Sequence, residues 1–226
     1  MTRLERAVLA ASGLVAVAFV LPLAVLVRDG WEPLRRKDTA VVNALRLDEG
    51  WPRDVVLALT QLGAPLLLEA AALALFTVLV LRGRRKLAGY VGISVFGAQV
   101  VSISVKLVVE RVRPCIDAAS CPQTTSFPSG HAVGAAAFYA TAAILLLPII
   151  GRRAWALLAV PVLIALTRVL LGVHYPSDVL AGLLVGGCWA AACTAVLTGW
   201  REQMVGHSVP LEEVAEGVLS DHPEAG

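Results

Sequence analysis

The segment AVLAASGLVAVAFVLPLAVLV, residues 7–27, contains no charged side chain and decides the fold class. A helix that crosses a membrane needs about 20 consecutive apolar residues, and this run is long enough. Of the 226 residues, 58% are hydrophobic and only 16% are charged, against about 25% charged in soluble domains. This composition excludes a soluble enzyme and a disordered chain. Together with a net charge of only +2, it also argues against a nucleic-acid partner. The sequence predicts a membrane protein.

Five further apolar runs follow the first one, so six transmembrane helices are expected. They cover residues 55–81, 87–105, 132–150, 155–173 and 179–200. Backbone groups that face lipid must bond within their own segment, which favours helices, whereas a transmembrane β-barrel would show short alternating segments. The expected fold class is therefore all-α, a polytopic membrane protein with six helices. The first run exceeds the apolar region of a signal peptide and is expected to be retained.

The positions of Lys and Arg favour a topology with both termini in the cytoplasm. The segments that would then lie inside carry Arg3, Arg6, Arg82, Arg84, Arg85, Lys86, Arg152, Arg153 and Arg201. The first outer loop, residues 28–54, holds six basic residues, but six acidic residues accompany them. Residues 1–200 are expected to form one membrane domain. Residues 201–226, with six acids and one base, are expected to form a disordered cytoplasmic tail.

The outer loop 28–54 has a mixed character. It is polar, yet it contains scattered Val and Leu side chains and is flanked by Trp31 and Trp51. This pattern favours an interfacial amphipathic helix with aromatic anchors. An ordinary charged loop is the alternative.

The four cysteines fall into two pairs. Cys188 and Cys193 lie inside the sixth apolar run and are expected to be buried as small apolar residues. Cys115 and Cys121 lie in the loop after the third run, on the predicted outer side, where an oxidising compartment permits a disulfide. The spacing leaves both the bonded and the free state open. The same loop has no histidine, so a zinc site is not expected there.

Charged residues inside or beside membrane helices are costly and usually mark function. Lys106, Arg113 and Arg168 are three cations that the predicted topology places on one face of the membrane. Arginine suits phosphate oxygens through its planar fork, and lysine does so as a point charge. Ser129 and Gly130 stand at the start of the fourth helix, where free N–H groups and the helix dipole favour an anion. Snorkelling at the lipid interface could explain any one cation, but not the set.

Two histidines accompany these cations. The chain has four histidines, and His207 and His222 lie in the tail, so His131 and His174 are the only ones in the membrane body. Asp178 follows His174 by four residues and could orient its ring while also capping the sixth helix. Two histidines beside bound phosphate fit the roles of nucleophile and general acid.

The three clusters resemble the motifs of the type-2 phosphatidic acid phosphatase family, whose site is similar to that of vanadium-dependent haloperoxidases. KLVVERVRP, residues 106–114, matches the family's Lys-six residues-Arg-Pro motif, and residues 128–131 match its Pro-Ser-Gly-His motif. TRVLLGVHYPSD, residues 167–178, matches the third motif except that Thr167 stands where the family has serine. The resemblance covers about residues 7–200.

This resemblance implies a role for each matched residue. His174 would attack phosphorus and form a phosphohistidine, Asp178 would hold the other ring nitrogen, and His131 would protonate the departing oxygen. The phosphoryl oxygens would be bound by Lys106, Arg113, Ser129, the Gly130 N–H and Arg168. The site has no cluster of carboxylates, so neither a catalytic Mg²⁺ nor another cofactor is expected.

The membrane setting suggests a lipid phosphate or diphosphate as the substrate. Candidates in the family are undecaprenyl diphosphate, phosphatidylglycerol phosphate and phosphatidate, hydrolysed on the outer side of a bacterial cell membrane. The sequence does not choose among them, nor does it indicate an oligomeric state. The alternatives are a transporter, or a scaffold with a non-catalytic anion site. Glu69 is the only acid in the middle of a predicted span, and its role stays open. A haloperoxidase is disfavoured by six apolar spans.

Overall fold

The computed structural model describes residues 3–114 and 125–205, in which every regular element is a helix and no strand occurs. The long apolar runs form helices because each backbone N–H can then bond within its own segment. In chain order the elements are α1 (Arg3–Val15), the π-helix η1 (Ala16–Val20), α2 (Leu21–Arg28), α3 (Glu32–Leu45), α4 (Trp51–Thr60), the 3₁₀ turn η2 (Gln61–Gly63), α5 (Pro65–Leu81), α6 (Arg85–Val109), α7 (Gly130–Ile150), the 3₁₀ segment η4 (Gly151–Leu158), α8 (Ala159–Leu170) and α9 (Pro176–Val205). The predicted all-α class is confirmed.

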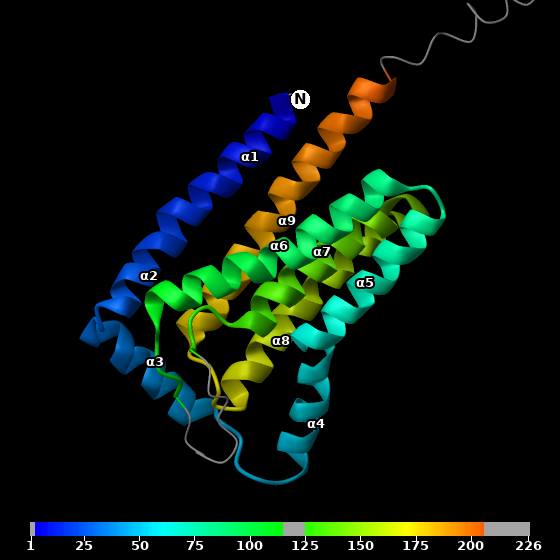
Figure 1. Ribbon diagram of the computed structural model, residues 1–226. Helices are drawn as coiled ribbons and strands as arrows, with labels where there is room; N and C mark the ends of the chain where they lie inside the picture. The colour runs from blue at the N-terminus through cyan, green and yellow to red at the C-terminus, as the bar shows by residue number, and fades with distance from the viewer. Residues whose placement is uncertain (1–2, 115–124, 206–226) are drawn as a thin grey trace, which may run out of the picture.

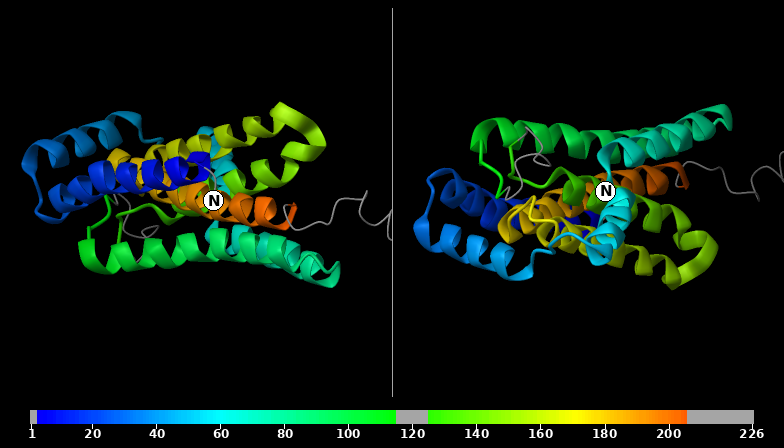
Figure 2. Two further views of the ribbon diagram at one scale, coloured as in Figure 1. Left: turned by 90° about the horizontal axis from the view of Figure 1, so that it is seen from above. Right: turned by 90° about the horizontal axis from the view of Figure 1, so that it is seen from below.

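Five stretches of the described chain are long and apolar enough to cross a membrane. They are Arg6–Arg28, Trp51–Leu81, Arg85–Val109, Gly130–Leu170 and Pro176–Val196. The fourth stretch has 41 residues and contains α7, η4 and α8, which do not continue in one line (Figures 1 and 2). A multi-pass membrane protein is confirmed. The count of six crossings and the orientation of the termini stay predictions.

The change of direction between α7 and α8 has a local cause. Pro148 lies in the last turn of α7, and Gly151 follows that helix with a φ of +61°. Proline lacks the N–H of a regular turn, and glycine adopts positive φ without steric cost. The chain therefore leaves α7 as a 3₁₀ segment, and α8 returns to pack against α7 (Figure 2).

α7 is the central helix, with α5, α6, α8 and α9 packed around it. Its closest neighbour is α9, which approaches through Gly182 and Gly186. A Cβ atom at Gly182 would lie 2.8 Å from the Ser129 carbonyl oxygen, and one at Gly186 would overlap the Val133 carbonyl. Two small residues four positions apart allow such a close approach between membrane helices. This packing fixes the start of α9 against the start of α7.

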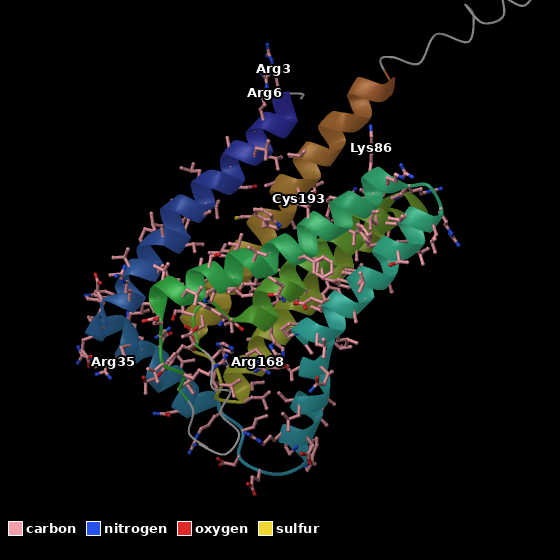
Figure 3. All side chains as sticks on the ribbon, viewed as in Figure 1. Arg3, Arg6, Arg35, Lys86, Arg168 and Cys193 are labelled. Carbon is pink, nitrogen blue, oxygen red and sulfur yellow. The ribbon has the colours of Figure 1, made fainter. Side chains whose placement is uncertain are left out.

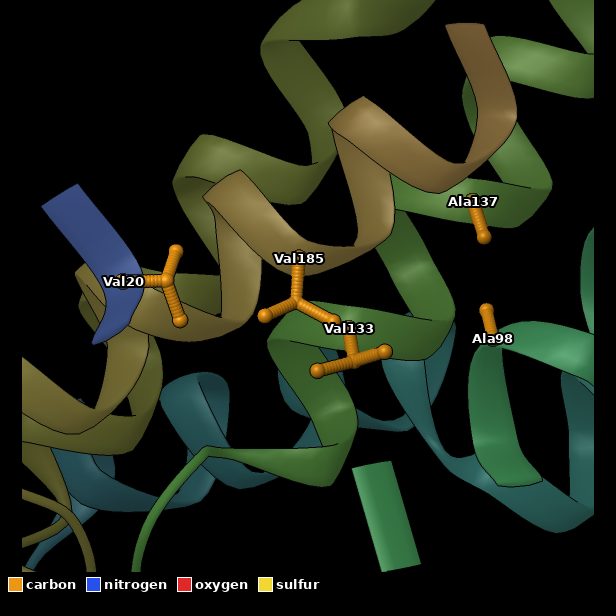
Figure 4. Close-up of a cluster of buried hydrophobic side chains, with 5 residues drawn as sticks. All are labelled: Val20, Ala98, Val133, Ala137 and Val185. Atoms are coloured by element: carbon orange, nitrogen blue, oxygen red, sulfur yellow. The ribbon is translucent and has the colours of Figure 1, made fainter. Parts of the chain in front are cut away.

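A small apolar core joins the N-terminal helices to this bundle. Figure 4 shows it, with buried side chains from η1, α6, α7 and α9: Val20, Ala98, Val133, Ala137 and Val185. The side chains are short, so the helix backbones pack closely. The core lies deeper in the bundle than the polar ends of the helices.

Charged side chains gather at the two ends of the bundle. Arg3, Arg6 and Lys86 lie at one end, and Arg35 and Arg168 lie toward the other (Figure 3). The helix α3 lies at the second end, within the predicted loop 28–54. Its Asp38 and Val42 are buried, whereas Arg35 pairs with Glu32 on the exposed face at 2.8 Å. The helix itself is thus present, and its position at a membrane interface stays a prediction.

At its C-terminal end, α9 continues to Val205 and so includes the first five residues of the predicted tail, 201–205. The prediction of disorder is wrong for these five residues. The rest of the predicted tail lies outside the described residues.

Candidate active site

The segment between α6 and α7 brings the first motif onto the second. Glu110 ends α6 in the left-handed region, with a φ of 49°, so the chain turns away from the helix axis. The amide of Ser126 then donates to the carbonyl of Arg111 at 2.7 Å. This bond joins the two ends of the connection, so the motifs at 106–114 and 128–131 lie at one end of the bundle. The segment 171–178 between α8 and α9 completes the site.

His174 is buried, with only 2% of its surface exposed. Its Nδ1 lies 3.5 Å from Asp178 Oδ2, and its Nε2 lies 2.8 Å from Nη1 of Arg113. A guanidinium group can only donate, so Nε2 accepts and the ring proton is on Nδ1, toward the carboxylate. Burial lowers the pKa of His174 to about 4, although the charge of Asp178 acts in the opposite direction. The imidazole is therefore neutral at pH 7, with its lone pair directed at a cation.

Asp178 is fully buried and accepts several hydrogen bonds. Arg111 Nη1 donates to Oδ1 at 2.6 Å, the Tyr175 amide donates to Oδ2 at 2.9 Å, and the hydroxyl of Ser126 also donates to Oδ2. The carbonyl of Asp178 accepts the Ser129 amide at 3.0 Å. The residue thus orients His174 and links the start of α9 to the start of α7.

A second buried carboxylate lies on the far side of Arg111. This carboxylate belongs to Asp38, whose Oδ2 accepts a hydrogen bond from Arg111 Nη2 at 2.8 Å. The Arg111 guanidinium also lies 4.0 Å from the centre of the Tyr175 ring. Asp38 also accepts the amide of Ser177 at 3.1 Å and the Ser177 hydroxyl. Burial disfavours the charged form of Arg111, but the charges of Asp178 and Asp38 raise its pKa. Arg111 therefore pairs with two buried carboxylates at once, which leaves one net negative charge in the group.

The predicted phosphate-binding residues face the other side of His174. Lys106 Nζ donates to the Thr125 carbonyl at 2.8 Å, and Arg113 Nη1 donates to the Val173 carbonyl at 3.0 Å. Arg168 Nη1 donates to the hydroxyl of Thr60 at 3.1 Å. Burial lowers the pKa of Arg113, yet a guanidinium keeps its charge in proteins.

Two polar atoms in this region are buried without a partner in residues 3–114 and 125–205. They are the hydroxyl oxygen of Ser129 and Nε of Arg168. A buried polar atom without a hydrogen bond costs about 1 to 3 kcal/mol, so each one needs an explanation, and a bound ligand is one. Gln99 Nε2 and Ser102 Oγ on α6 are also buried without a partner in the described residues. His131 lies half-buried in the first turn of α7.

The sequence profile of the PAP2 superfamily matches residues 85–202, more than half of the chain. The chain belongs to the PAP2 superfamily. It is 37% identical over 132 residues to decaprenylphosphoryl-5-phosphoribose phosphatase of Mycobacterium tuberculosis, covering 55% of this chain and 69% of that one. It is 31% identical over 156 residues to phosphatidylglycerophosphatase B of Bacillus subtilis, covering 63% and 74%.

A shorter match is to lipid A 1-phosphatase of Rhizobium etli, with 47% identity over 72 residues. It covers 32% of this chain but only 29% of that relative's length. The crystal structure of a transmembrane PAP2 type phosphatidylglycerolphosphate phosphatase from Bacillus subtilis has a similar fold, with a TM-score of 0.70, 24% identity and coverage of 83% of this chain and 94% of that one. The predicted phosphatase is thus confirmed at the level of the PAP2 family.

Contacts and charge interactions bring the predicted motif residues together: His174, Asp178, His131, Lys106, Arg113, Ser129, Gly130 and Arg168. Their roles stay predictions. Cys115 and Cys121 lie outside the described residues, so the predicted disulfide does too. No group of three possible metal-ligating side chains occurs in the described ranges.

Several residues that contact the candidate site were not among the predicted site residues: Asp38, Thr60, Arg111, Ser126, Tyr175 and Ser177. Arg111 lies between the defining Lys106 and Arg113 and reads as a spacer. Asp38 and Thr60 come from α3 and α4, outside the three motifs and far from them in the chain. A charged residue on the apolar side of α3, one turn before Val42, was the one available signal for Asp38.

Proposed function

We propose that this protein is an integral membrane phosphatase that removes phosphate from a lipid phosphate or lipid diphosphate. The observation that carries the proposal is the environment of His174. This buried neutral imidazole directs its lone pair at a cation, and a nearby serine hydroxyl and guanidinium nitrogen have no partner among the described residues. A phosphoryl group supplies oxygen acceptors for such donors. It also supplies the electrophile that a neutral histidine attacks.

The reaction then proceeds in two displacements. His174 Nε2 attacks phosphorus as the bond between phosphorus and the leaving oxygen breaks, and His131, protonated beside the bound phosphoryl dianion, gives its proton to that oxygen. Water next attacks phosphorus, His131 takes the water's proton, and the bond from Nε2 to phosphorus breaks. Inorganic phosphate leaves and the free enzyme is restored.

Arg113 has a particular part in this sequence. It donates to His174 Nε2 at 2.8 Å, so the lone pair is occupied until the guanidinium turns to a phosphoryl oxygen. Lys106, Arg168, Ser129 and the Gly130 amide complete the phosphate site. Charge stabilisation and positioning of this kind account for most of the rate in phosphoryl transfer.

Asp178 stabilises the positive charge that develops on His174 during attack, because it faces the opposite ring nitrogen. Arg111 and Asp38 act through Asp178 and are positioning residues. Two carboxylates next to one guanidinium keep a net negative charge beside His174, whereas Arg111 with Asp178 alone would be neutral. Asp38 therefore keeps this group negatively charged, and that negative charge stabilises the imidazolium that His174 becomes during attack.

The hydrolysis proposed here does not need a metal ion. Arg111, Tyr175, Ser126 and Ser177 direct their donors at the carboxylate oxygens of Asp38 and Asp178. These oxygens are the acceptors that Mg²⁺ would otherwise take. We expect activity to survive a chelator.

The membrane arrangement is part of the proposal. We propose six crossings, with α7 and α8 as separate ones, both termini in the cytoplasm and the site on the outer side of the bacterial cell membrane. Residues 1–200 would then form the catalytic domain, with 201–226 as a cytoplasmic tail. The bilayer and the lipid substrate are the partners. Named relatives act on a decaprenylphosphoryl-5-phosphoribose substrate and on phosphatidylglycerophosphate, which supports a lipid substrate of either general kind.

Phosphate release by the detergent-purified protein, with EDTA present, tests this function. The substrate panel contains phosphatidate, phosphatidylglycerol phosphate, undecaprenyl phosphate and undecaprenyl diphosphate. His174→Ala is expected to abolish turnover, whereas the control His207→Ala, in the predicted tail, should leave it unchanged. Radiolabelled substrate, quenched in alkali, should leave label on the native protein but not on His174→Ala. A folded native protein that hydrolyses no lipid would instead favour a transporter or scaffold. Strict dependence on Mg²⁺ would refute the metal-independent step.

A further inference from the structure

An open groove of about 640 Å³ lies between the N-terminal helices, α6 and α9. Its size is within the usual range for small-molecule sites, about 300–1,000 Å³. The N-terminal side of the groove is formed by α1 and the π-helix η1. It includes Gly13 of α1, where an added Cβ would meet no atom within 4 Å. Single π-helical turns inside α-helices are frequent at functional sites. The residues that line the groove belong to α1, η1, α2, α6 and α9, and Figure 1 shows how these helices are arranged.

The lining offers almost nothing to a polar ligand. Only two serines contribute hydroxyl groups, and both bond to their own helix: Ser12 Oγ donates to the Val8 carbonyl at 2.8 Å, and Ser104 Oγ to the Val100 carbonyl at 2.9 Å. A polar group placed here would lose its bonds to water without replacement. The groove is therefore suited to a hydrocarbon.

A second apolar cavity, of about 250 Å³, continues the groove away from the catalytic end. The two share Leu9, Trp189 and Ala192 among their lining residues. Trp189 is held in place because its Nε1 donates to the Ile93 carbonyl at 3.0 Å and its ring lies on Gly97, where a Cβ would be 2.6 Å away. We call the two cavities together the trough.

The trough is longer than one leaflet of a bilayer. Along α6 its lining runs from Val109 to Tyr90, a span of nineteen residue steps, which correspond to about 28 Å of helix. The hydrocarbon core of a whole bilayer is about 30 Å thick, so one leaflet supplies about half of that. An ordinary acyl chain that starts at the catalytic end would fill only the first half of the trough.

The catalytic end of the trough reaches the phosphate site through one layer of side chains. Val109 and Ala24 line the trough and also pack with Phe127, which is fully buried. Phe127 follows Ser126, the residue that donates to Asp178. On α6, the lining residue Val105 directly precedes Lys106. A head group at Lys106 therefore lies beside the start of the trough.

We propose that the trough binds the hydrocarbon chain of the substrate and makes the enzyme selective for chains longer than one leaflet, such as polyprenyl chains. This rests on the proposed phosphatase function. A polyprenyl phosphate combines the two chemistries that the structure places end to end, a phosphoryl group at Lys106 and an apolar chain along α1, α6 and α9. Packing of the far half of the trough then contributes to binding only when the chain is long enough to reach Trp189.

The test compares two substrates that share the terminal phosphate and differ in chain length, undecaprenyl phosphate and farnesyl phosphate. Ala192→Phe fills the trough where the two cavities meet, on the side far from the site. We expect it to lower kcat/KM for undecaprenyl phosphate by about tenfold or more while farnesyl phosphate changes by less than about twofold. Val100→Phe is the matched control, because Val100 is 63% exposed on α6 and outside the trough. It should alter neither substrate.

A binding readout separates this proposal from the phosphatase function. His174→Ala, mixed in detergent micelles with undecaprenyl phosphate that carries a photoreactive group at its far end, should cross-link at residues of α1 or α9 near Ala192. Equal losses for both chain lengths in Ala192→Phe, or cross-links confined to other faces, would overturn the proposal. So would a trough filled by a second copy of the chain or by bilayer lipid of any length, because selection by length would then be absent. Cross-linking without hydrolysis by the native protein would instead remove the proposed function and keep the trough.

Discussion

The side chains on the two sides of the site differ in how completely their hydrogen bonds are made. On the His174 side, Asp178 accepts donors from Arg111, Ser126 and Tyr175. On the phosphate side, the Ser129 hydroxyl and Arg168 Nε have no partner in the described chain, although both are buried. In the mechanism proposed above, this difference means that the protein orients the His174 ring with its own groups and leaves donors for the phosphoryl oxygens. Preorganised donors of this kind need no rearrangement when charge develops.

Removal of the two histidines tests this division most strongly. His174→Ala removes the nucleophile, and we expect kcat/KM to fall by about 10⁴-fold or more. His131→Ala removes a proton donor, whose contribution is about 10²- to 10⁴-fold. Phosphate release from one lipid phosphate measures both. If His174→Ala is more active than His131→Ala, His174 is not the nucleophile and the proposed roles of the two histidines are wrong.

Arg111 tests whether the His174 side depends on its charge balance. Arg111→Met leaves Asp38 and Asp178 buried without their cation, which costs about 3 to 5 kcal/mol. We expect a lower Tm in detergent, measured at one fixed scan rate. Adding Asp38→Asn to Arg111→Met removes one of the two uncompensated charges and should recover part of the Tm. If the double variant is less stable than Arg111→Met, the two residues are not coupled as the contacts indicate.

Two serines provide a matched pair across the comparison. Ser129→Ala removes a hydroxyl that has no partner within residues 3–114 and 125–205, so we expect about 10- to 100-fold less activity and no loss of Tm. Ser126→Ala removes a donor to buried Asp178, and we expect the free energy of unfolding to fall by about 1 to 3 kcal/mol. Activity and Tm of both variants, measured side by side, check this. A drop in Tm for Ser129→Ala would show that its hydroxyl is not reserved for a ligand.

The pKa of His174 predicts the pH response of the nucleophile side. Burial lowers this pKa to about 4, so His174 should become protonated and lose its lone pair only as pH falls through about 4. The acid limb of kcat/KM that His174 causes should therefore lie well below the ordinary histidine pKa of about 6.5. His131→Asn, measured over the same range, identifies the part of the profile that His131 causes. A His174 limb near pH 6.5 would contradict a buried neutral imidazole.

The same shift has a consequence for stability. Between the folded pKa of about 4 and the unfolded value of about 6.5, the unfolded chain binds a proton at His174 and the folded protein does not. The contribution of this group to the free energy of unfolding thus falls as pH decreases through that window and changes no further below it. Tm recorded across the window, for the native protein and His174→Ala, should show a weaker dependence in the variant.

The smallest effect is expected at Thr167, the one departure from the family motif. Its hydroxyl bonds to the Ile164 carbonyl at 2.6 Å and to Thr60 at 2.9 Å. Thr167→Ser keeps these bonds and removes one methyl group, so we expect activity within about twofold of the native protein. Thr167→Val, which removes the bonds instead, should reduce activity more because Thr60 also holds Arg168. Equal activities for the two variants would contradict this link.

The sequence predicted the membrane helices well because apolar length is a local property. The runs at 7–27, 55–81 and 87–105 each fall within stretches long enough to span a bilayer. It predicted the run at 155–173 less well, because Gly151 and the 3₁₀ segment η4 shorten α8 to twelve residues. The residue at which α8 begins depends on how the chain packs back on α7. A local sequence pattern does not contain that information.

In the site, the sequence found residues whose chemistry is unusual in a membrane and missed those that act by contact. Two histidines and three cations in apolar surroundings are visible without a structure. Asp38 was one of six acids in a charged loop, and only its contacts with Arg111 and Ser177 distinguish it. Asp38 is 73 positions from Arg111 and 139 positions from Ser177, and sequence spacing alone cannot reveal that residues so far apart are in contact.

The buried bond between Asp38 and Ser177 also constrains the biogenesis of the protein. Asp38 is synthesised early, whereas Arg111 emerges later and Ser177 belongs to the last helix. A carboxylate stays in water until its partners can replace its hydration. We therefore expect α3 to dock on the bundle only after α9 has formed, because Asp38 lacks its partners until then. Truncated or stalled chains would then hold an incomplete site, and catalytic competence would report that the whole protein has been made.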